Sequence, residues 1–201
     1  MQTLDCEQGT EEWFAARLGI PTASCFKDLI TSQGKRASPF STYANKLAAE
    51  RLMGKSPESF TSEWMQRGTE MEPQARASYE FDRGVNIEQV GFCTLDDGSA
   101  GASPDGLTAD YGLEIKCPAP HTHVGYLAAG KLPAAYVPQV QGCMWICERE
   151  HWDFMSFHPD MPALLIRVDR DQAYIDELAK LVAALNEKVR QTLEAIQKVI
   201  A

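Results

Sequence analysis

The N-terminal part of the chain has the three- and four-residue spacing of apolar positions that is typical of helices. Short helices are predicted at 10–17 and 22–30, each beginning with a threonine that can cap it. Longer helices are predicted at 40–53 and 62–83, and each is followed directly by a glycine. Pro73 is expected to break or bend the second of these. The opening of the chain is therefore expected to be helical.

After residue 84 the pattern changes to short runs of apolar and β-branched residues, bounded by charged, glycine or proline residues. These runs predict strands at 85–95, 100–103, 113–117, 152–157 and 164–168. We expect 100–103 and 113–117 to be adjacent strands. A helix is predicted at 134–147, and the apolar stripe over 171–200 predicts a long amphipathic helix whose stripe packs on the core rather than in a coiled coil.

The length and composition of the chain limit the class of protein. Its 201 residues suit a single domain, 1–201, and 44% hydrophobic with 23% charged residues is the balance of a globular protein. No run of about 18 apolar residues is present and the first ten residues are polar and acidic, so we expect a cytoplasmic protein with no membrane partner. Six scattered cysteines without a CxxC pair suggest reduced thiols.

The formal net charge of −9 argues against a nucleic-acid partner, because lysine and arginine side chains drive phosphate binding. However, carboxylates are needed to hold divalent cations, and a few basic residues in one groove can bind DNA on an otherwise acidic protein. The polar stretch 31–39 is predicted to be a mobile loop that carries Lys35 and Arg36 outward, where they could contact a polyanion. The distribution of charge therefore matters more than its total.

Two neighbouring sequences, SPDG at 103–106 and LEIKC at 113–117, carry the residues most suited to catalysis. Alternate side chains of a strand share a face, so Glu114 and Lys116 are expected to point together, away from the apolar residues between them. Asp105, in the turn beside this strand, can approach Glu114, and two converging carboxylates suit Mg²⁺ or Mn²⁺. The lysine can orient or help to deprotonate the attacking water and offset charge on a phosphate.

An ExK tripeptide alone is more typical of a surface ion pair than of an active site. In this chain eight residues separate Asp105 from Glu114, giving the spacing D-x8-ExK, and an upstream helix carries Glu72 within the run 68–80. The combination is much more specific than the tripeptide.

These motifs resemble those of the PD-(D/E)xK nuclease superfamily, and specifically of the phage lambda exonuclease family of YqaJ-like viral alkaline exonucleases. SPDG with GLEIKCP resembles the catalytic motif, and three further sequences match in the same order along most of the chain: WFAARLGIPTAS, RGTEMEPQARASYE and AYVPQVQGCMW. The resemblance implies an α/β (α+β) fold, with a restriction-endonuclease-like central mixed β-sheet flanked by helices.

The resemblance also implies a role for each matching residue. Asp105 and Glu114 correspond to metal ligands, together with the backbone carbonyl of Ile115, and Lys116 corresponds to the catalytic lysine that positions or activates the attacking water. Glu72 corresponds to a helix glutamate that assists at a second metal, directly or through water. Two Mg²⁺ ions per active site are therefore expected, and Mn²⁺ is expected to substitute.

Gln139 matches the family's glutamine near the scissile phosphate or nucleophile, whereas Gln141 would lie on a different helix face and is the weaker candidate. Pro138 is expected to perturb the start of the predicted helix and the placement of Gln139. The four histidines have no ligand spacing to a cysteine, and we expect no catalytic role for them; His121 and His123 are predicted to lie in a proline-rich loop.

Arg17, Ser24 and Ser103 are implied by the resemblance to bind a terminal 5′-phosphate. A guanidinium fork and a hydroxyl near a helix start suit that ligand. Without the resemblance, Arg17 would be interpreted as a surface arginine at the end of a helix.

The activity implied is 5′→3′ digestion of linear double-stranded DNA to mononucleotides, which leaves a 3′ overhang for recombination. A ring-shaped homotrimer and a single-strand annealing recombinase as partner are implied in the same way. An endonuclease with this fold is one alternative, and an iron–sulfur nuclease is disfavoured because no cysteine follows Cys147. An inactive DNA-end-binding protein is another, and the intact set of Asp105, Glu114 and Lys116 argues against it.

Overall fold

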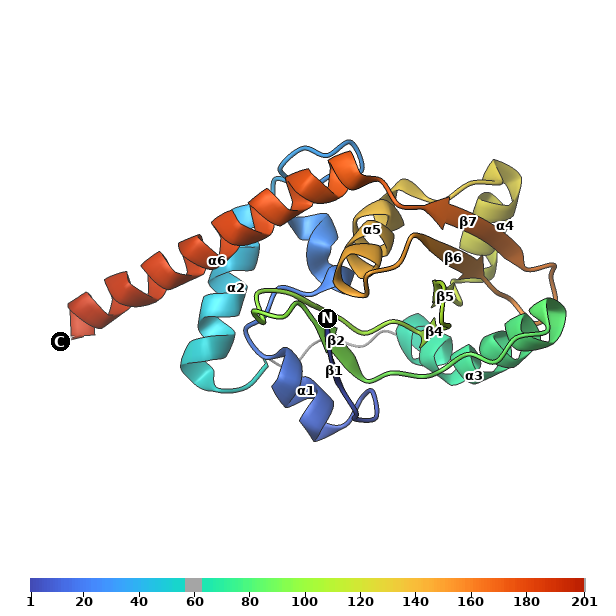
Figure 1. Ribbon diagram of the computed structural model, residues 1–201, viewed down its shortest axis with the longest axis horizontal. Helices are drawn as coiled ribbons and strands as arrows, with labels where there is room; N and C mark the ends of the chain where they lie inside the picture. Colours follow the sequence, from blue (N-terminus) through green and yellow to red (C-terminus); the bar gives the residue numbers. More distant parts are fainter. Residues whose placement is uncertain (57–62, 201) are drawn as a thin grey trace.

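The computed structural model describes residues 1–56 and 63–200, and its strands form two sheets (Figure 1). The first sheet is antiparallel, in the order β1 (Gln2–Leu4), β2 (Phe92–Thr94) and β3 (Gly101–Ala102). The second is mixed, in the order β4 (Gly106–Leu107), β5 (Gly112–Lys116), β6 (His151–Ser156) and β7 (Leu164–Asp169). Its β5 and β6 are parallel, while the other neighbours are antiparallel. The predicted α+β class is confirmed.

The strands at 113–117, 152–157 and 164–168 were predicted correctly to within a residue or two, but two other expectations were wrong. Only Phe92–Thr94 of the run 85–95 forms a strand, since Glu88 makes just an isolated bridge to Leu107. The run 100–103 is not adjacent to β5, because β3 pairs with β2 and the short β4 occupies the place beside β5. β-branched composition therefore marked buried segments without specifying their partners.

The helices and short 3₁₀ segments lie around these sheets as follows: α1 (Glu11–Arg17), η1 (Ala23–Asp28), α2 (Phe40–Met53), α3 (Glu63–Arg83), α4 (Pro120–Ala129), η2 (Ala134–Tyr136), α5 (Val137–Ile146) and α6 (Gln172–Ile200). Thr10 caps α1 by accepting a hydrogen bond from the backbone nitrogen of Trp13 at 3.4 Å. The segment predicted at 22–30 is a 3₁₀ helix, and Thr22 makes no side-chain cap. Pro73 lies inside α3 without ending it, and the predicted first residue, Ser62, lies outside the described residues.

The proline-rich loop predicted to carry His121 and His123 is instead the helix α4. Pro120 stands in its first turn, where the missing N–H costs no hydrogen bond, so the proline starts the helix rather than preventing it. His123 is fully buried, with its Nδ1 2.7 Å from the hydroxyl of Ser156.

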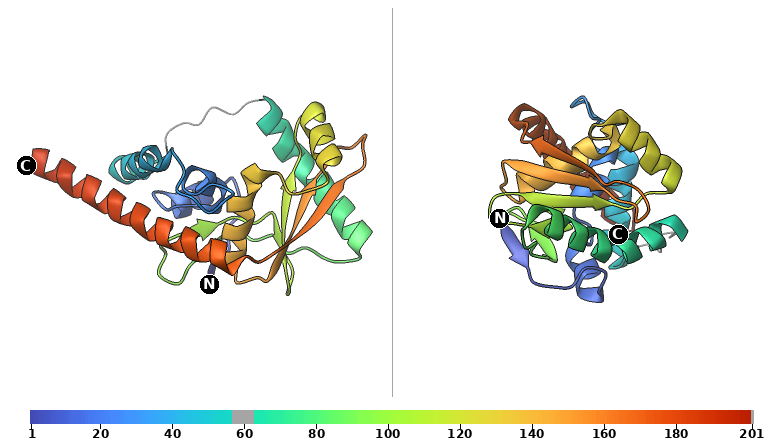
Figure 2. Two further views of the ribbon diagram at one scale, coloured as in Figure 1. Left: turned by 90° about the horizontal axis from the view of Figure 1, so that it is seen from above. Right: turned by 90° about the vertical axis from the view of Figure 1, so that its right-hand side faces the viewer.

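The two faces of the mixed sheet pack against different helices. Leu113 and Ile115 of β5 point toward Ala75 and Tyr79 of α3, while Phe154 of β6 faces the core formed with α5, α2 and α6. Figure 2 shows α3 on one side of this sheet and α5 on the other. The helix α6 buries the first part of its apolar stripe as predicted, but its last turns extend beyond the body of the protein (Figures 1 and 2).

All six cysteines are free thiols in the structure. No helix within the described ranges combines the length and the apolar character that a membrane span requires.

Gly112 of β5 provides a test of this packing. A Cβ atom on Gly112 would lie 2.3 Å from the fully buried ring of Trp152. We expect Gly112→Ala to lower the free energy of unfolding, measured by urea denaturation, by about 1–3 kcal/mol. Gly125 of α4 has nothing within 4 Å of the corresponding position, so Gly125→Ala should leave stability unchanged or raise it. Equal effects of the two substitutions would contradict the tight packing of β5 on Trp152.

Candidate active site

Glu114 is the most deeply buried charged residue of the site, with 0% of its surface exposed. Its Oε1 forms an ion pair with Nζ of Lys116 and accepts a hydrogen bond from Nε2 of Gln139 at 2.6 Å. The alternation of β5 thus places Glu114 and Lys116 on one face, as the sequence predicted. The apolar residues Leu113 and Ile115 between them pack on the other face.

Asp105 meets Glu114 because of the register of the short hairpin. Gly106 pairs with Leu113, and one step further along this antiparallel pair Asp105 stands opposite Glu114. Oδ2 of Asp105 accepts a hydrogen bond from the backbone nitrogen of Ile115 at 2.6 Å, which holds the carboxylate against β5. A cavity of about 390 Å³ opens here, lined by residues that include Glu72, Asp105, Ile115, Lys116 and Tyr136.

Gln139 reaches the site although a proline precedes it. As expected, Pro138 changes the start of the helix predicted at 134–147: residues 134–136 form the 3₁₀ segment η2, and α5 begins at Val137 with the proline in its first turn, where it is compatible with a helix. Gln141 lies on a different face of α5, as predicted: its amide donates to the carbonyl oxygen of Asp169 at 3.0 Å and accepts from the backbone nitrogen of Asp171 at 2.9 Å. Gln141 therefore joins α5 to the start of α6 and does not contact Glu114.

Arg17 lies among hydroxyl groups and aromatic rings. It donates to Oγ of Ser103 at 2.7 Å and to Oγ of Ser24 at 3.3 Å, and its guanidinium lies 4.1 Å from the ring centre of Trp13. Burial lowers the pKa of Arg17, but a guanidinium keeps its charge in proteins. No carboxylate of residues 1–56 and 63–200 forms an ion pair with it. A cation with only neutral partners is suited to bind an anion.

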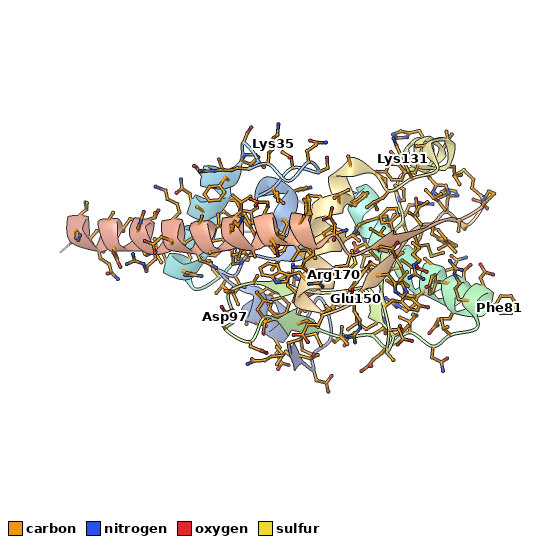
Figure 3. The ribbon with its side chains drawn as sticks, turned by 45° about the horizontal axis from the view of Figure 1, so that its top comes forward. Lys35, Phe81, Asp97, Lys131, Glu150 and Arg170 are labelled. Carbon is orange, nitrogen blue, oxygen red and sulfur yellow. The ribbon has the colours of Figure 1, made fainter. Side chains whose placement is uncertain are left out.

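Arg17, its two serine partners and the carboxylate groups open into one cavity of about 220 Å³. Its walls include all but one of the side chains predicted for catalysis or phosphate binding: Arg17, Ser24, Ser103, Asp105, Glu114, Lys116 and Gln139. The remaining one, Glu72, lines the adjoining cavity of about 390 Å³. By contrast, Lys35 points outward from its loop, and Arg36 lies 3.7 Å from the ring centre of Phe40, so neither joins the site (Figure 3).

The structure adds three residues that the sequence did not predict to act in the site. Trp13 donates from Nε1 to Ser103 at 2.8 Å and so shares a partner with Arg17. Tyr136 lies 5.5 Å from Nζ of Lys116, measured to its ring centre. Arg76 pairs with Glu72, and its position four residues later in α3 is the spacing that could have indicated this contact.

Burial and mutual repulsion control the charge of the carboxylates. Burial raises the pKa of Glu114 to about 8, the charges of Asp105 and Glu72 act in the same direction, and Lys116 opposes them. The pKa of Asp105 is raised by burial as well, against the opposing effect of Lys116 and the N–H of Ile115. Although burial acts to lower the pKa of Lys116, the charges of Glu114 and Asp105 raise it above its ordinary value, so the lysine is a cation.

The side chains fit a divalent cation, although they do not enclose one completely. Among the described residues, no three His, Cys, Asp or Glu side chains are close enough together to form a ready-made metal site. Oε2 of Glu114, however, is a buried carboxylate oxygen with no hydrogen-bond partner in the described part of the chain. An unsatisfied buried anion is costly, and a cation shared with Asp105 would compensate it.

An α+β fold in which a mixed sheet brings together Asp105, Glu114 and Lys116 has the architecture of the PD-(D/E)xK proteins. The sequence model of the YqaJ-like viral recombinase domain matches residues 12–150. This match covers more than half of the chain, and the protein belongs to the family of YqaJ-like viral recombinase domains.

Solved structures agree with this assignment. The chain is 36% identical to LHK-Exo, an alkaline exonuclease from Laribacter hongkongensis, with a TM-score of 0.86 over 95% of this chain and 98% of that one. A complex of LHK-Exo with dAMP matches equally well. A phage-related exonuclease from Haemophilus somnus 129PT shares the fold, with 18% identity and a TM-score of 0.69 over 88% of this chain and 96% of the other. No curated protein matches the sequence.

The raised pKa of Glu114 predicts how cation binding depends on pH. As the pH falls toward and below about 8, a growing fraction of the Glu114 carboxylate takes up a proton that a cation must displace, so affinity should rise with pH and level off above this value. Calorimetric titration of the DNA-free protein with Mn²⁺ at several pH values between roughly 6 and 9 would measure this slope. A constant affinity over that range would mean that Glu114 is ionised throughout.

Proposed function

We propose that this protein is a metal-dependent 5′→3′ exonuclease that digests linear double-stranded DNA to mononucleotides and leaves 3′ single-stranded overhangs. The observation that supports it most strongly is the cavity shared by Arg17 and the carboxylates of Asp105 and Glu114. A phosphate held by Arg17 would place the next phosphodiester toward these carboxylates. An enzyme that binds a terminal phosphate beside its reacting groups acts on DNA ends, which distinguishes it from an endonuclease.

Each side chain has a task in this proposal. Asp105, Glu114 and the backbone carbonyl of Ile115 would hold one Mg²⁺, and Glu72 would assist a second; Mn²⁺ should be able to replace either. Bound cations supply Lewis acidity to the phosphate and make water a better nucleophile. Lys116 orients the attacking water and offsets negative charge that develops on the phosphate. Gln139 fixes the rotamer of Glu114 through its hydrogen bond to Oε1.

The terminal phosphate would be bound by Arg17, Ser24 and Ser103. The two hydroxyls lie within hydrogen-bond distance of the guanidinium, so an anion that contacts Arg17 can also accept from them. Trp13 stacks on the guanidinium and shares Ser103 with it, which restricts the orientation of Arg17. The kinship with LHK-Exo, an alkaline exonuclease, supports the reaction class.

Further properties of this proposal come from the length and composition of the chain, for the domain and the location, and from the resemblance to the family, for the assembly and the partner. We propose that residues 1–201 act as one nuclease domain in the cytoplasm, assembled as a ring-shaped homotrimer around the DNA. Its partner would be a single-strand annealing recombinase, which loads on the overhang. A ring would concentrate basic side chains toward the DNA while the acidic residues face solvent, consistent with the net charge of −9.

The proposal is tested with linear duplex DNA labelled at one 5′ end and a covalently closed circle, each with Mg²⁺ or EDTA. We expect mononucleotides from the linear DNA alone, and none with EDTA.

In the same assay Lys116→Ala should bind DNA but cleave it at least about a hundredfold more slowly, because the attacking water and the phosphate lose the ammonium group of the lysine. Lys131→Ala, at an exposed lysine of the turn after α4, is the matched control and should cleave normally.

Other outcomes would change the assignment. A nicked or linearised circle would indicate an endonuclease, and DNA that is bound but never cleaved would indicate an end-binding protein. Normal cleavage by Lys116→Ala would remove the lysine from the mechanism.

Recognition of the DNA end predicts a second result. Wild-type protein should digest 5′-phosphorylated duplex faster than 5′-hydroxyl duplex, and Arg17→Ala should lose this preference without slowing digestion of 5′-hydroxyl ends. A charge-assisted hydrogen bond to phosphate contributes about 1.5–3 kcal/mol, which corresponds to a preference of about tenfold or more. Arg167→Ala removes an exposed arginine of β7 and should keep the preference. Retention of the preference by Arg17→Ala would place the phosphate elsewhere.

A further inference from the structure

Arg76 is a buried arginine, 9% exposed, that contacts two of the segments bearing the catalytic carboxylates. Its Nη2 forms an ion pair with Oε1 of Glu72 at 2.5 Å, and its Nε donates to the backbone carbonyl oxygen of Asp105 at 3.1 Å. The side-chain amide of Gln89 adjoins the guanidinium, and its hydrogen bonding is satisfied when the amide oxygen, rather than the nitrogen, faces Arg76 and accepts from both Nη atoms. One side chain thereby joins α3, the turn before β4 and the segment that contains Gln89.

We propose that Arg76 is a positioning residue that holds Glu72 beside Asp105 and thereby sets the geometry of the divalent-cation site. This inference rests on the metal-dependent function proposed above. Arg76 binds Oε1 of Glu72, so the second carboxylate oxygen is left to bind a cation or a water. Its three partners are all groups of the protein, and for this reason Arg76 acts through Glu72 and Asp105 rather than on the DNA.

Electrostatic repulsion explains why the site needs such a residue. Glu72 and Asp105 line the same cavities, and two carboxylates in a partly buried site repel each other when no cation lies between them. The long side chain of Glu72, which is 32% exposed, could turn toward solvent to relieve this repulsion. The guanidinium of Arg76 offsets the repulsion and fixes the carboxylate before a metal ion binds.

The planar shape of the guanidinium matters as well as its charge. Arg76 reaches a carboxylate, a backbone carbonyl and an amide oxygen in three different directions, which its five fixed N–H donors allow. A lysine has the same charge, but its ammonium is a compact group with three donors and cannot reach three separated acceptors from one position. The substitution Arg76→Lys therefore separates the contribution of geometry from that of charge.

The test is calorimetric titration of the DNA-free protein with Mn²⁺, which reports binding independently of cleavage. Arg76→Gln, Arg76→Lys, Glu72→Gln and the Arg76→Gln/Glu72→Gln double variant are compared with wild type, after thermal unfolding has shown that each is folded. The matched control is Arg190→Gln, which removes an exposed arginine of α6 that also pairs with a glutamate four residues away, Glu194.

We expect Arg76→Gln to weaken Mn²⁺ binding by roughly tenfold or more, as is typical when a residue that orients a metal ligand is lost. Glu72→Gln should weaken it to a similar extent, and the double variant should be no weaker than Glu72→Gln alone, because both substitutions remove the same contact. Arg76→Lys should fall between Arg76→Gln and wild type, and Arg190→Gln should bind as wild type does. If Arg76→Gln does not fold, the comparison of Arg76→Lys with wild type decides the outcome.

Two results would overturn the inference alone, and a third would overturn the proposed function as well. Wild-type affinity in Arg76→Lys and Arg76→Gln, or additive losses in the double variant, would show that Arg76 does not act through Glu72 while leaving the metal-dependent function in place. A wild-type protein that binds no Mn²⁺ and cleaves no DNA would overturn the proposed function itself, and the role of Arg76 with it.

Discussion

A carboxylate removed completely from water is the constraint on which this structure depends. Glu114 has no exposed surface, and a buried charge is tolerated only when neighbouring groups compensate it. Lys116 provides a cation from the same strand, Gln139 provides a donor from α5, and one oxygen is left without a partner. The packing of α5 and the register of β5 are therefore constrained by the site, because a shift of either element would expose the carboxylate of Glu114 or remove one of its partners.

The central residues were predictable because local spacing determines their geometry. The alternation in β5 places Glu114 with Lys116, and the short hairpin brings Asp105 opposite Glu114. Contacts between distant segments left no such signal: Trp13 and Ser103 are ninety residues apart, and their hydrogen bond depends on how α1 packs beside β2, the strand that pairs with β3. The helix α4 was missed because a proline at a first turn and a proline in a loop look the same in sequence.

The net charge of −9 gave a misleading impression of the possible partners, and the structure shows why. Arg17, Arg76 and Lys116 are all partly or largely buried around connected cavities, so their charges act where water is scarce and the effective dielectric constant is low. Several ion pairs on α6, such as that of Arg190 with Glu187, lie in contrast on the exposed surface and are screened by salt. The net charge counts buried and exposed charges equally, so it says little about the charge inside the cavities.

The hydrogen bond from the nitrogen of Ile115 to the side chain of Asp105 makes the position of this carboxylate depend on the number of residues between the two. Beyond Leu113 the backbone N–H of Ile115 donates to a carboxylate oxygen instead of a backbone carbonyl oxygen. The last hydrogen bond between the two segments is therefore made by a side chain of the site. Residues inserted at 108–111 would only enlarge the turn, provided that Gly106 still pairs with Leu113. A single residue inserted between Asp105 and Gly106 would point the carboxylate to the opposite face of the sheet. Natural variation in length should therefore be tolerated on one side of β4 and absent on the other.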